Sequence, residues 1–81
     1  MLSAVEVEVY IKQGLACDHV HVLGDDGTHF EAVIVSPEFE GKSMVQQHQL
    51  VYAALGDRMR AEIHALSMKT YTPQKWHEIN Q

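Results

Sequence analysis

Two short motifs limit how this chain can fold, because each marks the start of a helix. Ser3 is followed three residues later by Glu6, and Ser43 is followed three residues later by Gln46. In such a capping box the two side chains satisfy backbone amides that have no partner in the first helical turn. The sequence therefore predicts one helix after Ser3 and another after Ser43.

The apolar residues after Ser3 fit two different repeats, one typical of a helix and one typical of a strand. At helical spacing, one face contains Ala4, Val7, Ile11 and Leu15. The segment Val5–Val9 also alternates with period two, as a strand does. The cap and the longer stripe favour the helix, with Gly14 near its end.

The residues behind the second box form a wider apolar stripe. It comprises Met44, His48, Val51 and Leu55, widened by Leu50 and Ala54. Gly56 is expected to interrupt or end this helix, and residues 57–61 are expected to form a further turn.

Three other segments alternate as strands do. His19–Leu23 has Val20 and Val22 on one face and its histidines on the other. The Gly- and Asp-rich stretch over residues 24–27 favours a turn, and Phe30, Ala32 and Ile34 then share a face, so a hairpin is predicted. Pro37 ends that hairpin. Residues 63–70 predict a third strand, and Thr72-Pro73 predicts the start of a short last helix that carries Trp76.

The predicted order is helix, two strands, helix, strand, helix, which defines an α+β domain. We expect a three-stranded sheet with helices packed on one face. The chain has 81 residues and 46% hydrophobic residues, so it predicts a single domain over residues 1–81 with modest stability.

Charge and composition exclude several classes of protein. Eleven acidic residues stand against six basic ones, giving a net charge of −5, so a nucleic-acid site would need a local basic patch. The longest apolar run, Leu50–Leu55, is far shorter than the roughly 20 residues of a membrane span. No secretion signal is recognised, and a lone cysteine, Cys17, fits a reducing cytosol, so we expect a cytoplasmic protein. The six histidines are the natural place to look for chemistry.

Several spaced motifs resemble one family. The stretch VSPEFEGKSMVQQHQLVYAAL over residues 35–55 resembles the signature of the BolA family. Residues 63–73, IHALSMKTYTP, followed by Trp76, resemble its C-terminal block, and residues 27–30, GTHF, resemble the opening of its second strand. The resemblance covers residues 2 to 78, and the short loop over residues 24–27 is closest to the branch called IbaG or YrbA. It implies a class II KH-like fold, including the strand order.

The resemblance implies two activities, neither of which is catalytic. One is partnership with a monothiol glutaredoxin, forming a heterodimer that holds or transfers a bridging [2Fe–2S] cluster shared with the glutaredoxin and glutathione. The other is DNA binding in stress-response transcriptional regulation. No cofactor is expected on the isolated protein, which we expect to be a monomer or a weak homodimer with no membrane partner.

Two histidines are candidate cluster ligands. The pattern alone favours a partly buried histidine at His64, on the same strand face as Leu66 and Met68. The resemblance favours a ligand instead, because His64 matches the histidine that the family places at the start of the third strand. His29 lies where the family supplies a second Cys or His ligand. Some members carry a cysteine at the position of Asp26, and a carboxylate suits iron–sulfur chemistry poorly. His29 is therefore expected to substitute, or the second ligand is absent. Imidazole ligands raise a cluster's potential and make it sensitive to protonation.

The remaining histidines and the cysteine have simpler interpretations. His19 and His21 lie about 7 Å apart on one strand face and are expected to be solvated, although the spacing permits a divalent metal. His48 is expected to pack in the core with one hydrogen bond, and His77 to lie on the surface. Cys17 is expected to be an inert, partly buried thiol. Without a Cys-x-x-Cys motif, the thiolates of a cluster would have to come from a partner.

Four basic residues are candidates for nucleic-acid contact: Lys42, Arg58, Arg60 and Lys69. A KH domain clamps the nucleic-acid backbone with Gly-x-x-Gly, whereas this chain has GKSM at residues 41–44, and a solvated charged surface is the alternative. Phe39 is either a partner anchor or buried against the sheet. An enzyme is not expected, because the sequence contains no nucleophile elbow and no Gly-rich phosphate loop, and Asp25-Asp26 has turn composition.

Overall fold

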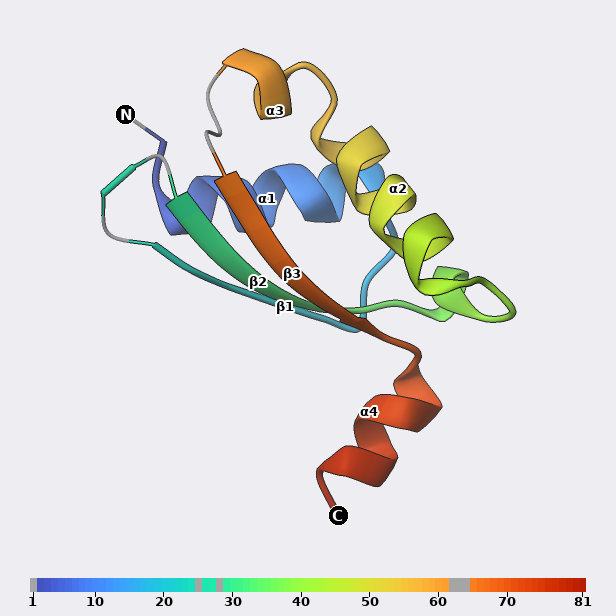
Figure 1. The fold of residues 1–81 in the computed structure, drawn as a ribbon. Helices are drawn as coiled ribbons and strands as arrows, with labels where there is room; N and C mark the ends of the chain where they lie inside the picture. Colours follow the sequence, from blue (N-terminus) through green and yellow to red (C-terminus); the bar gives the residue numbers. More distant parts are fainter. Residues whose placement is uncertain (1, 25, 28, 62–64) are drawn as a thin grey trace.

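The computed structural model describes residues 2–24, 26–27, 29–61 and 65–81, except for the side chains of Arg60 and Ala61. Figure 1 shows a sheet with two helices against it and a short helix beyond its end. The elements in chain order are α1 (Ala4–Gly14), β1 (His19–Leu23), β2 (His29–Val35), the 3-10 turn η1 (Pro37–Phe39), α2 (Met44–Leu55), α3 (Arg58–Ala61), β3 (Ala65–Tyr71) and α4 (Pro73–Ile79). No helix among the described residues is long and apolar enough to cross a bilayer.

Both predicted capping boxes are present. The Ser3 amide donates to Glu6 Oε1 at 3.0 Å, and the Glu6 amide donates to Ser3 Oγ at 3.1 Å. The equivalent Ser43–Gln46 bonds are 2.9 and 3.2 Å long. The strand alternative for Val5–Val9 is therefore wrong, because that segment is helical. Val5 and Val9 are exposed, whereas Val7 is buried. The helix prediction is confirmed.

The sheet is mixed, with strand order β1-β2-β3. β1 and β2 form the predicted antiparallel hairpin, with Val20 opposite Ile34. β2 and β3 run parallel, with Phe30 beside Leu66. A parallel pair needs a crossover, which α2 provides. The third strand was predicted to begin at residue 63; residues 63 and 64 lie outside the described residues, and β3 is described from Ala65.

Alternation along the strands puts one face of the sheet against the helices. β1 has the burial sequence exposed, buried, exposed, buried, exposed, with both valines inside. The fully or nearly buried core comprises Leu2, Val7, Ile11, Leu15, Val20, Val22, Phe30, Ala32, Ile34, Phe39, Val51 and Leu55. Phe39 is 0% exposed, so of its two alternatives burial is confirmed and the exposed partner anchor is wrong.

The predicted stripe of α2 is partly wrong. Met44 is 56% exposed, and Gln47 is buried in its place. The Gln47 amide donates to the Lys42 carbonyl at 2.9 Å, and its oxygen accepts from Thr70 Oγ1 at 2.7 Å. A buried amide is tolerated when its polar atoms have partners. Hydrophobic periodicity cannot anticipate such a residue, because its burial depends on Thr70, 23 residues away in the sequence.

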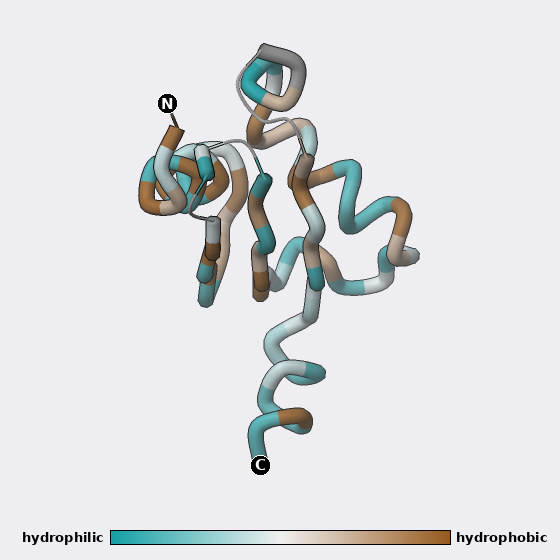
Figure 2. Tube along the Cα trace, turned by 60° about the vertical axis from the view of Figure 1, so that its left-hand side comes forward, coloured by the Kyte–Doolittle hydropathy of each residue, from teal (hydrophilic) through white to brown (hydrophobic). Residues whose placement is uncertain are grey.

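The last helix does not pack on the face that α1 and α2 cover. α4 extends past the end of the sheet in both views (Figures 1 and 2), and none of its residues is buried. Trp76 holds it by ring contacts, stacking on His19 at 5.2 Å between centroids and lying 5.4 Å from the Tyr71 ring. The expected sheet with helices packed on one face is confirmed by α1 and α2, while α4 lies beyond the end of the sheet. A seven-residue helix with one large aromatic has too little apolar surface to compete for the core.

The two large helices meet where α1 has no side chain. A Cβ added at Gly14 would lie 2.7 Å from Ala54 Cα and 2.8 Å from Ala54 Cβ on α2. Real Cβ atoms do not approach backbone this closely, so the contact requires glycine. Gly14 thus sets the distance between the two helices that cover the sheet.

We predict that Gly14→Ala lowers the free energy of unfolding by about 1–3 kcal/mol through overpacking. Helix propensity alone predicts the opposite sign, since alanine is favoured over glycine by about 1 kcal/mol. Urea denaturation measures the difference. Gln13→Ala, on an exposed neighbour, serves as control and should stay within about 0.5 kcal/mol of the parent protein. An unchanged or raised stability for Gly14→Ala would contradict the proposed contact.

Candidate functional site

The clearest polar arrangement lies where the β1–β2 loop enters β2. The His29 amide donates to Asp26 Oδ1 at 2.8 Å, and His29 Nδ1 lies 2.7 Å from Asp26 Oδ2. Both side chains are more than half exposed, at 59% for His29 and 51% for Asp26. One carboxylate therefore fixes both the backbone and the ring of His29 at the surface.

Asp26 has a role that the sequence analysis missed. The sequence offers it only as a poor replacement for a ligand cysteine, whereas the structure places it as the partner that orients His29. Metal-binding histidines commonly use one ring nitrogen to contact a carboxylate, which fixes the ring and raises the basicity of the other nitrogen. The signal was present, because an Asp three residues before a strand residue can accept from that residue's amide.

His64 lies outside the described residues, so its distance from His29 is not described. The neighbouring residue, Ala65, is the Cα partner of His29 in the parallel pairing of β2 and β3. The chain thus enters β3 beside the first residue of β2. The candidacy of His64 stays a prediction.

The other histidines do not gather around a metal site. Among the described residues, no group of three or more His, Cys, Asp or Glu could hold a metal ion. His19 and His21 are exposed as expected, and His19 is stacked on Trp76. His77 is exposed and lies 3.0 Å from the Gln81 side-chain nitrogen.

The packing of His48 agrees with the prediction, but its hydrogen bonding differs. The ring is half-buried on α2, as expected for a packing role. However, its Nε2 is buried and has no hydrogen-bond partner in the described part of the chain. The expected single hydrogen bond is therefore absent at this nitrogen.

Cys17 is held as a protonated thiol. Its Sγ donates to the Leu15 carbonyl at 3.3 Å. Burial raises the pKa of the thiol to about 11, with the charges of Glu38 and Asp18 acting in the same direction and that of Lys12 opposing them. A thiol in this state is a poor nucleophile and a poor metal ligand at neutral pH.

The described basic side chains do not form one patch. Lys42 is exposed before the first turn of α2, while Arg58 lies over the Tyr10 ring, 3.8 Å from its centroid. Lys69 is exposed on the opposite face of the sheet, and the side chain of Arg60 lies outside the described part. DNA contact through this set stays a prediction that the geometry does not favour.

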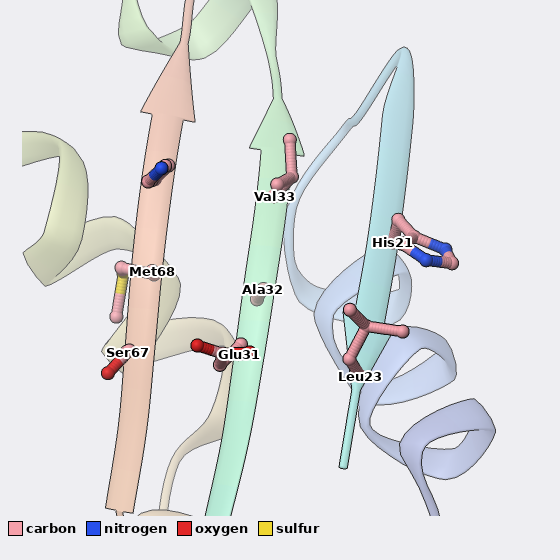
Figure 3. A pocket seen from close by; sticks show the side chains of 8 residues that line it. His21, Leu23, Glu31, Ala32, Val33, Ser67 and Met68 are labelled. Carbon is pink, nitrogen blue, oxygen red and sulfur yellow. The ribbon is translucent and has the colours of Figure 1, made fainter.

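A shallow hollow of about 240 Å³ lies on the face of the sheet opposite α1 and α2. Figure 3 looks onto this face, with His21 and Leu23 from β1 on one side and Ser67 from β3 on the other. Glu31 and Val33 from β2 lie between them. Sequence alternation predicts which residues face outward, but only the strand register brings these residues from three strands together.

This α+β sheet, with a His–Asp pair at the start of its second strand, can be compared with known proteins. The family model described as BolA-like protein matches residues 1–75. The chain is 40% identical to Protein BOLA2 of Arabidopsis thaliana, covering 100% of this chain and 90% of that protein. It is 39% identical to Acid stress protein IbaG of Escherichia coli K12, covering 88% of this chain and 84% of that protein. It covers only 39% of the human BolA-like protein 1, which has 44% identity over 54 residues.

Solved structures of BolA proteins superpose on this chain. A bolA protein homologue from Coxiella burnetii superposes with a TM-score of 0.81 at 43% identity, covering 95% of this chain and 99% of that one. The BolA domain of SufE1 from Arabidopsis thaliana gives 0.75 at 33% identity, covering 88% of this chain and 92% of that one. The chain belongs to the BolA-like family, and its fold is the α+β fold of that family.

We predict that native Cys17 reacts with iodoacetamide at pH 8 about 100-fold more slowly than the same thiol in the urea-unfolded chain. The reason is the rise of the pKa from 9.0 to about 11, which lowers the thiolate fraction by that factor. Mass spectrometry of timed samples gives both rates. Comparable rates in the two states would show that burial does not protect the thiol.

Proposed function

We propose that this chain is a non-enzymatic partner of a monothiol glutaredoxin, with which it holds or transfers a bridging [2Fe–2S] cluster. The observation that carries the proposal is the exposed His29 ring, oriented through Nδ1 by Asp26. The arrangement is the one that metal-binding histidines use in proteins generally. Family membership supports an iron–sulfur role, as does the occurrence of a BolA domain in SufE1.

The donor set of this chain fits a shared cluster rather than a self-contained one. Iron–sulfur clusters are held mainly by thiolates, with imidazole as a known substitute. The one cysteine is a protonated, half-buried thiol, so it does not supply a thiolate. The chain would contribute imidazole nitrogens, and a glutaredoxin cysteine together with glutathione would contribute the sulfur ligands.

His29 and His64 are the proposed ligands. The pairing of His29 with Ala65 supports this choice, because Ala65 follows His64 directly in the sequence. When bound, the cluster would supply electron storage and a transferable iron–sulfur unit. The chain's own contribution is to present the imidazoles and, through Asp26, to hold the His29 ring in place.

We expect reconstitution with a monothiol glutaredoxin, glutathione, iron and sulfide to give a heterodimer with its own visible circular dichroism spectrum. His64→Ala should change the spectrum or shorten the cluster's lifetime, and His29→Ala should do the same. Asp26→Asn should give a weaker effect of the same kind, because it removes the charge that orients the ring. The histidine variant His77→Ala, on an exposed residue in α4, is the matched control and should leave the spectrum unchanged.

The variants separate the possible outcomes. An unchanged spectrum for His64→Ala removes that residue from the ligand set, and an unchanged spectrum for the double variant His29→Ala/His64→Ala contradicts the proposal. Copurification of the variants with the glutaredoxin, checked by size-exclusion chromatography, distinguishes loss of a ligand from loss of the complex.

A further inference from the structure

One methionine at the start of α2 is exposed to solvent and also contacts a buried residue of the sheet. Met44 is 56% exposed, whereas Met59 and Met68, the other described methionines, are partly buried against the core. The Sδ atom of Met44 lies 3.3 Å from Oγ1 of Thr70, which is 4% exposed on β3. α2 passes beside β3 in Figure 1, so this contact lies at the junction of the two elements.

The Thr70 hydroxyl has a second acceptor within reach. It carries one hydrogen, and its Oγ1 also lies 2.7 Å from Gln47 Oε1. The Gln47 amide nitrogen donates to the Lys42 carbonyl at 2.9 Å, which fixes Oε1 as the end that faces Thr70. A thioether is a weak acceptor, so the hydrogen goes to Gln47 while Met44 is reduced. The buried amide then has a partner at both ends, as buried polar groups require.

We propose that Met44 is a modification site for hydrogen peroxide, and that its oxidation is transmitted to the contact between α2 and β3. A lone pair of the sulfur attacks one peroxide oxygen, so that an S–O bond forms and the O–O bond breaks. The proton of the transferred oxygen ends on the departing hydroxide, which leaves as water. Sulfur loses two electrons and peroxide gains them, and the products are methionine sulfoxide and water.

The sulfoxide changes the competition for the Thr70 hydrogen. Its oxygen is a polar acceptor on a flexible side chain that already contacts Thr70. When the hydroxyl donates to the sulfoxide, Gln47 Oε1 is left buried without its partner, and a buried unpaired acceptor destabilises the fold. The first turn of α2 and the end of β3 are then held together less tightly. Methionine sulfoxide reductases reverse the oxidation, so the response to peroxide is reversible.

The test is graded peroxide treatment of the folded protein, followed by peptide mass spectrometry and thermal unfolding. Met44 should be oxidised about tenfold or more faster than Met59 and Met68, because it is the more exposed residue. The oxidised parent protein should have a Tm about 5 °C lower, as expected for the loss of one buried hydrogen bond in a domain of this size. Treatment with methionine sulfoxide reductases A and B should restore the Tm.

Three variants separate this route from general oxidative damage. Met44→Leu keeps a similar side-chain volume and cannot be oxidised at this position, so peroxide should leave its Tm unchanged. The double variant M44L/V45M moves the methionine to a neighbouring position that is 66% exposed, where it should be oxidised without a fall in Tm. Thr70→Val removes the hydroxyl, so its Tm should be lowered before treatment and should not fall further when Met44 is oxidised.

Three results would overturn the proposal. They are oxidation of Met59 or Met68 as fast as Met44, a parent Tm that stays constant once Met44 is oxidised, and an equal fall in Tm for M44L/V45M. A further fall in the Tm of folded Thr70→Val would also count against it. If that variant does not fold, Met44→Leu and M44L/V45M still decide, because both keep the hydrogen bond between Thr70 and Gln47.

Discussion

Burial of one face of a three-stranded sheet is the constraint on which the rest of this molecule depends. Val20, Val22 and Ile34 turn towards α1 and α2, and they can do so because strand side chains alternate between faces. The helices must lie close enough to fill that space, and Gly14 against Ala54 permits it. After the end of β2, Ser36 Oγ donates to the Ala16 carbonyl at 2.5 Å, and the Glu38 carboxylate accepts from the Ala16 amide at 2.9 Å. These bonds tie the segment after α1 to the end of β2.

The candidate ligand site follows from the same constraint. His29 opens β2 on the side that alternation directs away from the core, so its ring is exposed while the next residue, Phe30, is buried. Asp26 orients its imidazole through Nδ1. The fold thus places a fixed nitrogen donor at the surface, where a ligand shared with another protein must be. Cys17, half-buried with its pKa raised to about 11, is excluded from that role by the same packing.

Because α1 and α2 cover only one face of the sheet, its edge and its opposite face have other neighbours. Glu8 of α1 covers one edge of the sheet, since its carboxylate accepts from the Val22 amide of β1 at 3.0 Å. The opposite face of the sheet is covered at its α4 end, where Trp76 stacks on His19 and lies beside Tyr71.

The sequence by itself determined the helix starts, the hairpin and most of the apolar core, because capping boxes and alternation are local signals. It also carried the family motifs, from which the strand order and the candidate ligands His29 and His64 were expected. It could not determine the burial of Gln47, the role of Asp26 or the position of α4. Each of these depends on a contact whose geometry the tertiary structure decides: Gln47 with Thr70, Asp26 with the His29 ring, and Trp76 with His19. Periodicity states which way a side chain points, whereas strand register and helix packing decide what it meets there.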